Sequence, residues 1–453
     1  MDFTAQRSVR VRRVLGAAAL ALATGAATLG LAVPATAAPA PVVGAPTPLP
    51  LVGTPAPLSA AGKAAAAPAG VTAEAGQRFV PVTPARLLDT RKPGFSPLYN
   101  SHPQILKIAG NGGVPLTGVK SVVLNVTVTE THSPGFLKMG PTGIAEPDSS
   151  NLNWAAGQTV SNQVVVPVGD DGNVVLLSPG KTGLMSGDTP RVQGIVDVFG
   201  YYTDDQAAGS TFSSLSPGRL LDTRAAVGVP GTTPVPGSGQ VDLQVAGRGG
   251  VPQTGVKAVV LNVTVTEPES NGFVKVWPSG IEQPDVSSIN WTPGQTKSNH
   301  VVVPVGADGK VSFYNAAGGS TDFVADVFGY YSDDPAGTTF HGVGPGRLVD
   351  TRTTNSPLGA FQAGTLGLGG HPALPGAKAV VLNVTVTETQ ADGFLTAWPA
   401  DTDLPDSSNL NWTAGQTVPN LVTVPLSADG SVNLGNLSGG STHLVLDVFG
   451  YFS

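Results

Sequence analysis

The sequence predicts an all-β protein of three tandem β-sandwich or jelly-roll-like modules, each with about eight strands, after a signal peptide and a Pro/Ala-rich linker. Three observations lead to this prediction. One set of short motifs recurs three times in the same order, and apolar residues alternate with polar ones at a period of two within each copy. Turns rich in glycine and proline separate the alternating segments, and the 453 residues include 59 glycines and 40 prolines.

The N-terminus predicts a secretory signal peptide over residues 1–37. Four arginines precede an alanine- and leucine-rich run, and Ala35-Thr36-Ala37 supplies the small residues that a signal peptidase accepts. Residues 38–77 contain many prolines and alanines and almost no charge, which is typical of an extended, semi-rigid spacer. We therefore expect a secreted, extracellular protein that is either released or associated with the cell surface.

Charge and cysteine content restrict the partners. The chain has 24 basic and 31 acidic residues, and removing residues 1–37 takes away four arginines but only one aspartate. This acidic balance argues against nucleic acid as a partner, because nucleic-acid binding requires clustered lysine and arginine. No disulfide can stabilise the exported chain, since it has no cysteine. No second long apolar run follows the signal peptide, so we expect no integral membrane anchor.

Three copies of one sequence unit follow the linker, over residues 78–203, 211–332 and 339–453. Each copy is long enough to enclose a hydrophobic core of its own, and the joints between copies are acidic and rich in small residues. We therefore expect three separate modules in a row. Four motifs mark the copies: RLLDTR or RLVDTR (from Arg86, Arg219 and Arg347), LNVTVTE (from Leu124, Leu261 and Leu382), GQT (from Gly157, Gly294 and Gly415) and DVFGY (from Asp197, Asp326 and Asp447).

Alternation of apolar and polar residues predicts the strands. In residues 122–129 four aliphatic side chains share one face, whereas Asn125 and Thr127 share the other, so we expect a half-buried antiparallel strand with an exposed polar face. An Asp-Gly pair, starting at Asp171, Asp308 and Asp429, predicts a tight hairpin turn in each copy. Seven further strands are predicted in the first copy, at ARLLDT, QILKIAG, GFLKM, SNLNW, NQVVVPV, NVVLLS and GIVDVFGYY.

The motifs resemble a module of secreted actinobacterial proteins. The resemblance rests on the series RLLDTR, LNVTVTE, GF(L/V), LNW or INW, GQT, N-x-V-x-VP and DVFGYY, and it covers about Arg78 to Ser453. In those proteins the module occurs in tandem or appended to cell-wall hydrolases such as amidases and peptidases. What the resemblance implies is an exported, surface-associated accessory module.

The RLLDTR motif places an aspartate two residues before an arginine in a weakly charged chain. On an extended strand Asp89 and Arg91 lie on the same face, as next-nearest neighbours. One interpretation is a catalytic carboxylate, paired with Asp197 of the last strand, and the other is a structural ion pair. An adjacent arginine lowers the pKa of an aspartate and makes it a poor proton donor, so we favour the structural interpretation. The predicted structural ion pairs are Asp89–Arg91, Asp222–Arg224 and Asp350–Arg352.

The six histidines give little support to an enzyme. None occupies an equivalent position in all three copies; His300, for example, aligns with Gln163 and Leu421. The chain also has no thiol and no glycine-rich phosphate loop, so we expect no catalytic residue and no cofactor. The Asp-Gly turns lack the oxygen-ligand spacing of a calcium loop, so we expect no metal site.

The five tryptophans fall into two groups. Three of them end the LNW or INW segments and share a face with an aliphatic neighbour, so we expect them in the core. Trp277 and Trp398 lie opposite aliphatic residues, beside a proline that ends the strand, and Gly140 replaces them in the first copy. We predict that both rings face solvent and form a ligand-binding platform for sugar; the alternative is that they cover a neighbouring module or loop. The core group is Trp154, Trp291 and Trp412.

Together these features predict a secreted, non-catalytic repeat protein that binds at the cell envelope, with polysaccharide or peptidoglycan as its ligand. The alternative is a protein-binding or adhesive surface spacer with no glycan ligand, and a hydrolase is the third hypothesis. The expected partner is therefore a cell-wall glycan or a surface protein.

Overall fold

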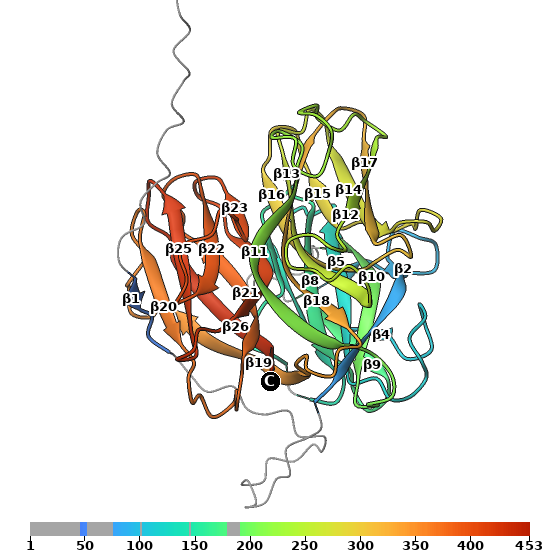
Figure 1. Cartoon of the computed structure of the whole chain (residues 1–453), viewed down its shortest axis with the longest axis horizontal. Coiled ribbons are helices and arrows are strands. Elements are labelled where there is room, and N and C mark those ends of the chain that lie inside the picture. The colour runs from blue at the N-terminus through green and yellow to red at the C-terminus, as the bar shows by residue number, and fades with distance from the viewer. Residues whose placement is uncertain (1–45, 52–75, 100–101, 145, 179–190) are drawn as a thin grey trace, which may run out of the picture. The chain divides into compact units, whose positions relative to one another are not determined.

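The computed structural model describes residues 46–51, 76–99, 102–144, 146–178 and 191–453 (Figure 1). In these residues every regular element is a β-strand, and no helix there is long and apolar enough to cross a membrane. The predicted signal peptide lies outside the described residues, as does most of the predicted linker. Of that linker, residues 47 and 48 form strand β1 (Thr47–Pro48), which pairs in parallel with a strand of the third copy.

The strands of the first and second copies are divided between two sheets per copy. In the first copy the sheet orders are β2-β10-β5-β8, with β3 paired to β10, and β4-β9-β6-β7. In the second copy they are β11-β18-β13-β16 and β12-β17-β14-β15. The first-copy strands are β2 (Arg78–Asp89), β3 (Leu98–Tyr99), β4 (Gln104–Lys107), β5 (Ser121–Thr129), β6 (Gly135–Pro141), β7 (Leu152–Trp154), β8 (Val160–Pro167), β9 (Asn173–Leu177) and β10 (Arg191–Thr203). The second-copy strands are β11 (Thr211–Asp222), β12 (Gln240–Gln244), β13 (Val256–Thr266), β14 (Gly272–Pro278), β15 (Ile289–Trp291), β16 (Lys297–Pro304), β17 (Lys310–Ala317) and β18 (Asp322–Ser332).

The third copy repeats this scheme. Its sheet orders are β19-β26-β21-β24 and β20-β25-β22-β23, and β1 joins the second of them at β20. Its strands are β19 (Phe340–Asp350), β20 (Ala363–Gly367), β21 (Ala379–Thr387), β22 (Gly393–Pro399), β23 (Leu410–Trp412), β24 (Val418–Pro425), β25 (Ser431–Ser438) and β26 (His443–Phe452).

This architecture corrects the predicted one. The sequence predicts three tandem β-sandwich or jelly-roll-like modules, whereas the structure organises six small sheets as a six-bladed β-propeller. Each of the eight segments predicted in the first copy overlaps a strand, so the local prediction is confirmed. The hairpins predicted at Asp171, Asp308 and Asp429 are wrong, because the two strands on either side of each turn belong to different sheets. Alternation predicts which side chains share a face, but it does not specify which strands pair.

Each copy has a cluster of buried aliphatic side chains contributed by both of its sheets. In the first copy this cluster includes Val126 and Val196 of one sheet and Leu137 and Val174 of the other, all 0% exposed. Equivalent clusters lie in the second and third copies. These side chains account for the alternation seen in the sequence.

A further cluster of buried side chains is shared by all three copies. Its aromatic rings contact one another in a cycle, so that each copy contacts the next and the third contacts the first. The copies are therefore not separate modules in a row, and by contacts residues 41–453 form one unit. The ring centroids are 4.4 Å apart for Phe79 and Tyr331, 4.2 Å for Phe212 and Phe452, and 4.2 Å for Phe340 and Tyr202.

The glycine of each DVFGY motif makes room for one of these aromatic rings. A Cβ at Gly200 would lie 2.3 Å from the ring of Phe79, and the distance is equally short at the other two positions. No side chain larger than hydrogen fits there without moving a buried ring. The equivalent pairs are Gly329 with Phe212 and Gly450 with Phe340.

The first strands of the three copies also pair with one another in a cycle. Phe79 exchanges two backbone hydrogen bonds with Ser210, which lies two residues before the equivalent Phe212 of the second copy. Phe212 does the same with Thr338, and Phe340 returns to Gln77. The backbone bonds between Gln77 and Phe340, at 2.7 and 2.8 Å, close the ring of three copies.

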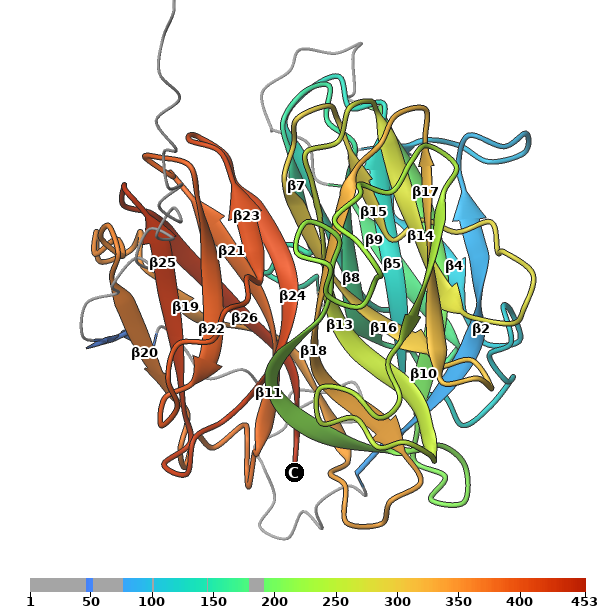
Figure 2. The same cartoon turned by 45° about the horizontal axis from the view of Figure 1, so that its top comes forward.

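Three buried asparagines connect the central strands β8, β16 and β24, which contact one another (Figure 2). The Asn299 side-chain oxygen accepts a hydrogen bond from the Gln163 backbone N–H of the first copy at 3.1 Å, and its nitrogen donates to Asn125 at 2.9 Å. Asn420 and Asn162 make the equivalent bonds, which again run around the ring. The backbone donors are His300 to Asn420 and Leu421 to Asn162, both at 3.0 Å, and the side-chain acceptors are Asn262 for Asn420 and Asn383 for Asn162.

These contacts correct the expected exposure of the LNVTVTE strand. Asn125 and Thr127 are each 1% exposed, so both faces of β5 are buried rather than one. The polar face lies against the second copy, where Asn125 donates a hydrogen bond to the backbone oxygen of Ser287 at 2.6 Å. Asn125 can therefore face a neighbouring copy instead of water, because both its side-chain nitrogen and its oxygen have hydrogen-bond partners there.

We predict that Phe212→Ala destabilises the whole fold. The ring is 1% exposed in the shared cluster, and truncating a buried phenylalanine costs about 3–5 kcal/mol of unfolding free energy. Urea unfolding of the mature chain measures this loss. Phe361→Ala is the control, because its ring is 38% exposed and should cost little. A loss below about 1 kcal/mol for Phe212→Ala would contradict a shared core.

Candidate functional sites: charge clusters and a surface cleft

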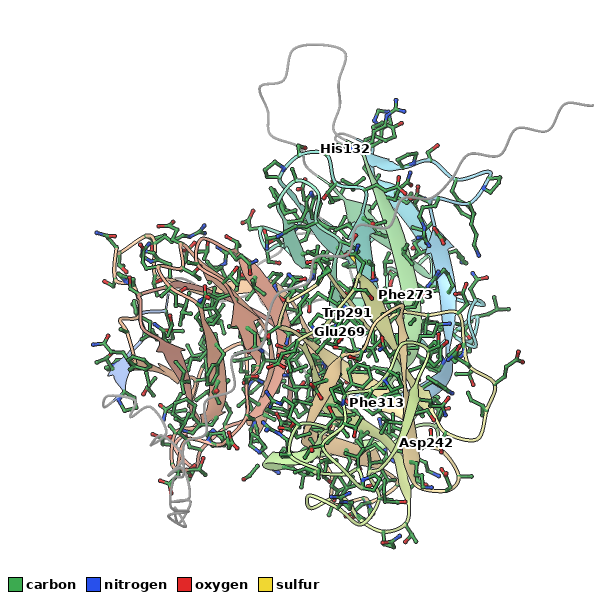
Figure 3. The ribbon with its side chains drawn as sticks, turned by 90° about the horizontal axis from the view of Figure 1, so that it is seen from above. His132, Asp242, Glu269, Phe273, Trp291 and Phe313 are labelled. Atoms are coloured by element: carbon green, nitrogen blue, oxygen red, sulfur yellow. The ribbon has the colours of Figure 1, made fainter. Side chains whose placement is uncertain are left out.

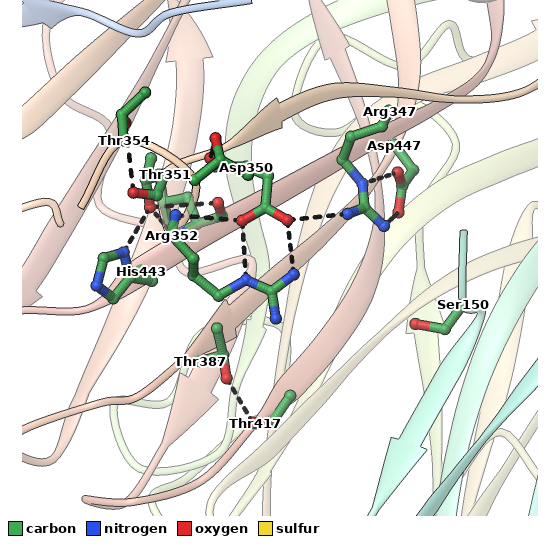
Figure 4. A network of polar contacts seen from close by, with 12 residues as sticks. Ser150, Arg347, Asp350, Thr351, Arg352, Thr354, Thr387, Thr417, His443 and Asp447 are labelled. Carbon is green, nitrogen blue, oxygen red and sulfur yellow. Dashed lines mark hydrogen bonds and ion pairs between the residues drawn. The ribbon is translucent and has the colours of Figure 1, made fainter. Parts of the chain in front are cut away.

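The RLVDTR motif of the third copy forms a cluster of four charges (Figure 4). Arg352 Nε and Nη2 donate to the two oxygens of Asp350 at 2.8 and 2.6 Å. Arg347 Nη1 donates to Asp350 at 3.1 Å, and its Nε donates to Asp447 of the DVFGY motif at 2.5 Å. Two guanidinium groups and two carboxylates therefore neutralise one another between strands β19 and β26.

The predicted pairs of the other copies have the same geometry. Arg91 Nε and Nη2 lie 2.8 and 2.7 Å from the oxygens of Asp89. Arg224 Nε and Nη2 lie 2.9 and 2.8 Å from those of Asp222. Asp89 also accepts a hydrogen bond from the Arg91 backbone N–H at 3.2 Å, so this aspartate fixes the turn that follows β2.

The first arginine of each motif is a residue that the sequence analysis missed. Arg86 Nε donates to Asp197 at 2.7 Å, and Arg219 Nε donates to Asp326 at the same distance. Recurrence of this arginine three residues before the aspartate was a signal in the sequence. Strand pairing was needed to show its partner, because Arg86 and Asp197 lie opposite each other in β2 and β10.

Arginine and burial act in opposite directions on the pKa of these aspartates. The guanidinium of Arg91 holds the pKa of Asp89 below its ordinary value, against the opposite effect of burial. Burial raises the pKa of Asp197, while the hydrogen bond from Arg86 opposes it. The oxygens of Asp89 accept hydrogen bonds from a donor that stays charged, so this carboxylate is poorly suited to donate a proton.

The charge clusters lie at the seams between copies. Asp197 of the first copy accepts a hydrogen bond from the Ser287 backbone N–H of the second copy at 3.2 Å. Arg219 Nη2 of the second copy donates to the Asp406 backbone oxygen of the third copy at 2.9 Å. The geometry thus gives the clusters of the first and second copies a positioning role, since each joins two strands of one copy to a loop of the next.

His300 is buried among polar groups of all three copies. Its Nδ1 lies 2.9 Å from Gln163 Oε1, and its Nε2 lies 3.0 Å from Thr423 Oγ1. Burial lowers the pKa of His300 to about 3, so the imidazole is neutral at physiological pH. Within the described residues, no group of three or more His, Asp or Glu side chains is arranged to hold a metal ion.

The tryptophans of the LNW and INW segments are buried, which confirms their predicted place in the core. Trp154 is 6% exposed, and Trp291 and Trp412 are each 4% exposed. Each indole nitrogen donates to a backbone oxygen; for Trp291, labelled in Figure 3, the acceptor is Ser270 at 3.0 Å.

The prediction that Trp277 and Trp398 face solvent is wrong. They are 2% and 4% exposed, so neither ring offers a platform to a sugar. The Trp398 indole nitrogen donates to the Thr402 backbone oxygen at 3.2 Å, and a Cβ at Gly435 would lie 2.9 Å from the ring. The ring therefore lies between a loop and strand β25, which fits the alternative that it covers a loop. Both faces of β22 are buried, so alternation did not distinguish them.

A cleft of about 620 Å³ lies beside the first copy and includes Gly342 of the third copy. Leu116 and Ile144 line it and are 76% and 46% exposed. The cleft is also lined by polar side chains that can donate or accept hydrogen bonds: Gln77, Thr117, Lys120, Ser121, Thr142, Asp170 and Asp171.

No protein-family model matches the chain, and no curated protein sequence matches it. Among solved structures, one described as the atomic structure of Sulfolobus turreted icosahedral virus is 10% identical with a TM-score of 0.16, and the match covers 83% of this chain and 90% of that one. Another, described as the triple jelly roll fold and turret assembly in an archaeal virus, is also 10% identical with a TM-score of 0.16, covering 83% and 91%. Likeness at this level carries no argument about fold or function.

We predict that Asp222→Ala lowers stability without a change in fold. The carboxylate is 4% exposed, and its removal leaves Arg219 and Arg224 without their shared acceptor. Breaking a partly buried ion pair of this kind should cost about 2–3 kcal/mol. Chemical unfolding measures the loss, with the exposed Asp403→Ala as the control. Equal unfolding midpoints for the two variants would contradict a structural role for Asp222.

We also predict that His300 makes stability depend on pH. The folded-state pKa of about 3 lies below the value of about 6.5 for an unfolded histidine. Its contribution is therefore fully present above pH ~6.5 and is lost as the pH falls towards 3, because the unfolded chain binds the proton first. From this group alone, the free energy of unfolding should fall by about 1.4 kcal/mol for each pH unit below ~6.

Urea unfolding between pH 7 and pH 4 tests this dependence. The matched variant is His300→Gln, because the first copy has Gln163 at this position. The difference in unfolding free energy, wild type minus variant, should decrease as the pH falls. Parallel pH profiles for the two proteins would contradict the prediction.

Proposed function

We propose that the chain is a secreted, non-catalytic protein that binds at the cell envelope, with polysaccharide or peptidoglycan as its ligand. The observation that carries this proposal is the cleft of about 620 Å³ beside the first copy. Its volume lies in the range of small-molecule sites, which allows it to accept a few sugar residues.

The lining of the cleft supports a glycan ligand. Asp170 is an exposed acceptor, and Lys120, which is paired with Asp204, keeps further ammonium donors for sugar hydroxyls. Leu116 offers an apolar surface against which the C–H face of a sugar ring can pack. These features replace the two tryptophans as the proposed contact with glycan.

The ionisable motif residues support a non-catalytic role. Every RLLDTR aspartate accepts hydrogen bonds from arginine. Among the described residues, His300 is the only fully buried histidine with a strongly lowered pKa, and both of its ring nitrogens contact protein groups. Secretion is supported by the composition of residues 1–37 and by the resemblance of the repeat motifs to an exported module.

A protein partner is the second candidate, and exposed apolar side chains favour it. Four of them belong to the first copy: Phe95, Ile105, Leu116 and Ile144 are 51%, 57%, 76% and 46% exposed. Exposed apolar groups gathered on one copy are typical of a surface that contacts another protein.

We predict that changes in the cleft weaken binding to purified cell walls. Asp170→Ala removes an acceptor, and Leu116→Gln introduces the residue that the second copy has at Gln253. Each change should weaken binding by roughly tenfold, since it removes about 1.4 kcal/mol of contact. Co-sedimentation with peptidoglycan measures this, and Asp403→Ala is the control because it lies on the third copy.

Protease treatment of the walls separates the two candidates. Binding that survives removal of wall proteins supports a glycan ligand, whereas binding that is lost supports a protein partner. Unchanged binding by both cleft variants would exclude the cleft. Turnover of polysaccharide or ester substrates by the wild type would favour the hydrolase hypothesis instead.

A further inference from the structure

The three GQT motifs meet at a small cavity where β8, β16 and β24 begin. Gln158, Gln295 and Gln416, one from each copy, line this cavity, which has a volume of about 30 Å³. Because equivalent residues of three copies surround it, the cavity lies where the three copies converge. It is separate from the surface cleft of the proposed function, with which it shares no lining residue.

The three glutamines present hydrogen-bond donors. The side-chain oxygen of Gln158 accepts a bond from the Ala155 backbone N–H at 2.8 Å, and those of Gln295 and Gln416 accept equivalent bonds at 3.2 and 3.1 Å. These bonds fix the amide orientation, so each Nε2 points away from that turn. Within the described residues, none of the three Nε2 atoms donates a hydrogen bond to an acceptor.

One lysine adds a positive charge to these donors. Lys297 lines the cavity at the position where the first and third copies have Val160 and Val418. Its Nζ donates to the Thr159 backbone oxygen at 3.1 Å, which occupies one of the three ammonium donors. Burial lowers the pKa of Lys297 to about 8, so the ammonium is still charged at neutral pH.

Nothing in the lining compensates this charge. Of the described residues around the cavity, none carries a carboxylate. A partly buried ammonium without a counter-charge is unfavourable, and an anion that reaches it relieves this cost. A volume of about 30 Å³ leaves room for one or two water-sized groups, so we expect a small anion rather than a sugar.

We infer that this cavity binds one small monovalent anion, a halide ion or the end of a carboxylate group, held by Lys297 Nζ and the glutamine N–H groups. Only Lys297 supplies charge, so a single substitution should remove the site. Lys297→Val is the matched variant, because valine is native at both equivalent positions and should therefore be compatible with the fold. Lys92→Val, which changes an exposed lysine outside the cavity, is the control.

Thermal melts in increasing sodium bromide or sodium acetate, balanced with sodium sulfate at constant ionic strength, test the inference. The melting temperature of the wild type should rise relative to Lys297→Val by about 2 °C between 0 and ~200 mM bromide, and Lys92→Val should follow the wild type. A rise in both salts identifies a carboxylate-accepting site, and a rise in bromide alone identifies a halide site. The inference is overturned if the melting temperature of the wild type does not rise relative to that of Lys297→Val in either salt.

Crystals grown without halide and soaked in bromide provide a second measurement that needs no variant. An anomalous peak in contact with Lys297 Nζ supports the site. Bromide that binds elsewhere while this cavity stays empty overturns it.

Discussion

The fold depends on one constraint, which is that three buried asparagine side chains complete their hydrogen bonds only with a neighbouring copy. Each donates one bond to a backbone oxygen of its own copy, but its side-chain oxygen finds a donor only in another copy. Asn162, Asn299 and Asn420 are at most 1% exposed, and each accepts a backbone hydrogen bond from the copy before it in the cycle. A buried amide without a partner costs about 1–3 kcal/mol. No copy can therefore satisfy its central strand alone. The aromatic contacts and the paired first strands obey the same cyclic order, so polar and apolar interactions specify one arrangement.

The local structure was predictable from the sequence, but the assembly of the copies was not. Alternation located the strands because side chains facing the core of each copy are aliphatic. It failed for Asn125, whose face is polar and yet buried, because period-two analysis treats every polar face as solvated. The RLLDTR pair was predicted from a spacing of two residues, although Arg91 lies in the turn after β2 and not on the strand. The partner of Arg86 required the register of β2 with β10. Burial of Trp398 depends on a loop that follows its strand, and alternation contains no information about loops.

Two of the differences between the copies lie where the copies converge. At one level of the central strands the three residues are Gln163, His300 and Leu421, and Gln163 binds His300. At another level they are Val160, Lys297 and Val418. A site shared by three strict repeats would contain three identical side chains, which for lysine means three charges in close contact. Because this chain encodes the three copies separately, one copy can supply a single charge or a single imidazole to the site where all three converge.

The ring of first strands has a consequence for the symmetry of assembly. Each copy presents one surface to the next copy and a different surface to the previous one, and the contact between Phe340 and Gln77 closes the circle after three steps. Contacts of this head-to-tail kind define a cyclic group, so a polypeptide with a single copy would need to form a homotrimer to bury the same surfaces. Covalent linkage in tandem makes this association intramolecular. The ring then forms independently of protein concentration.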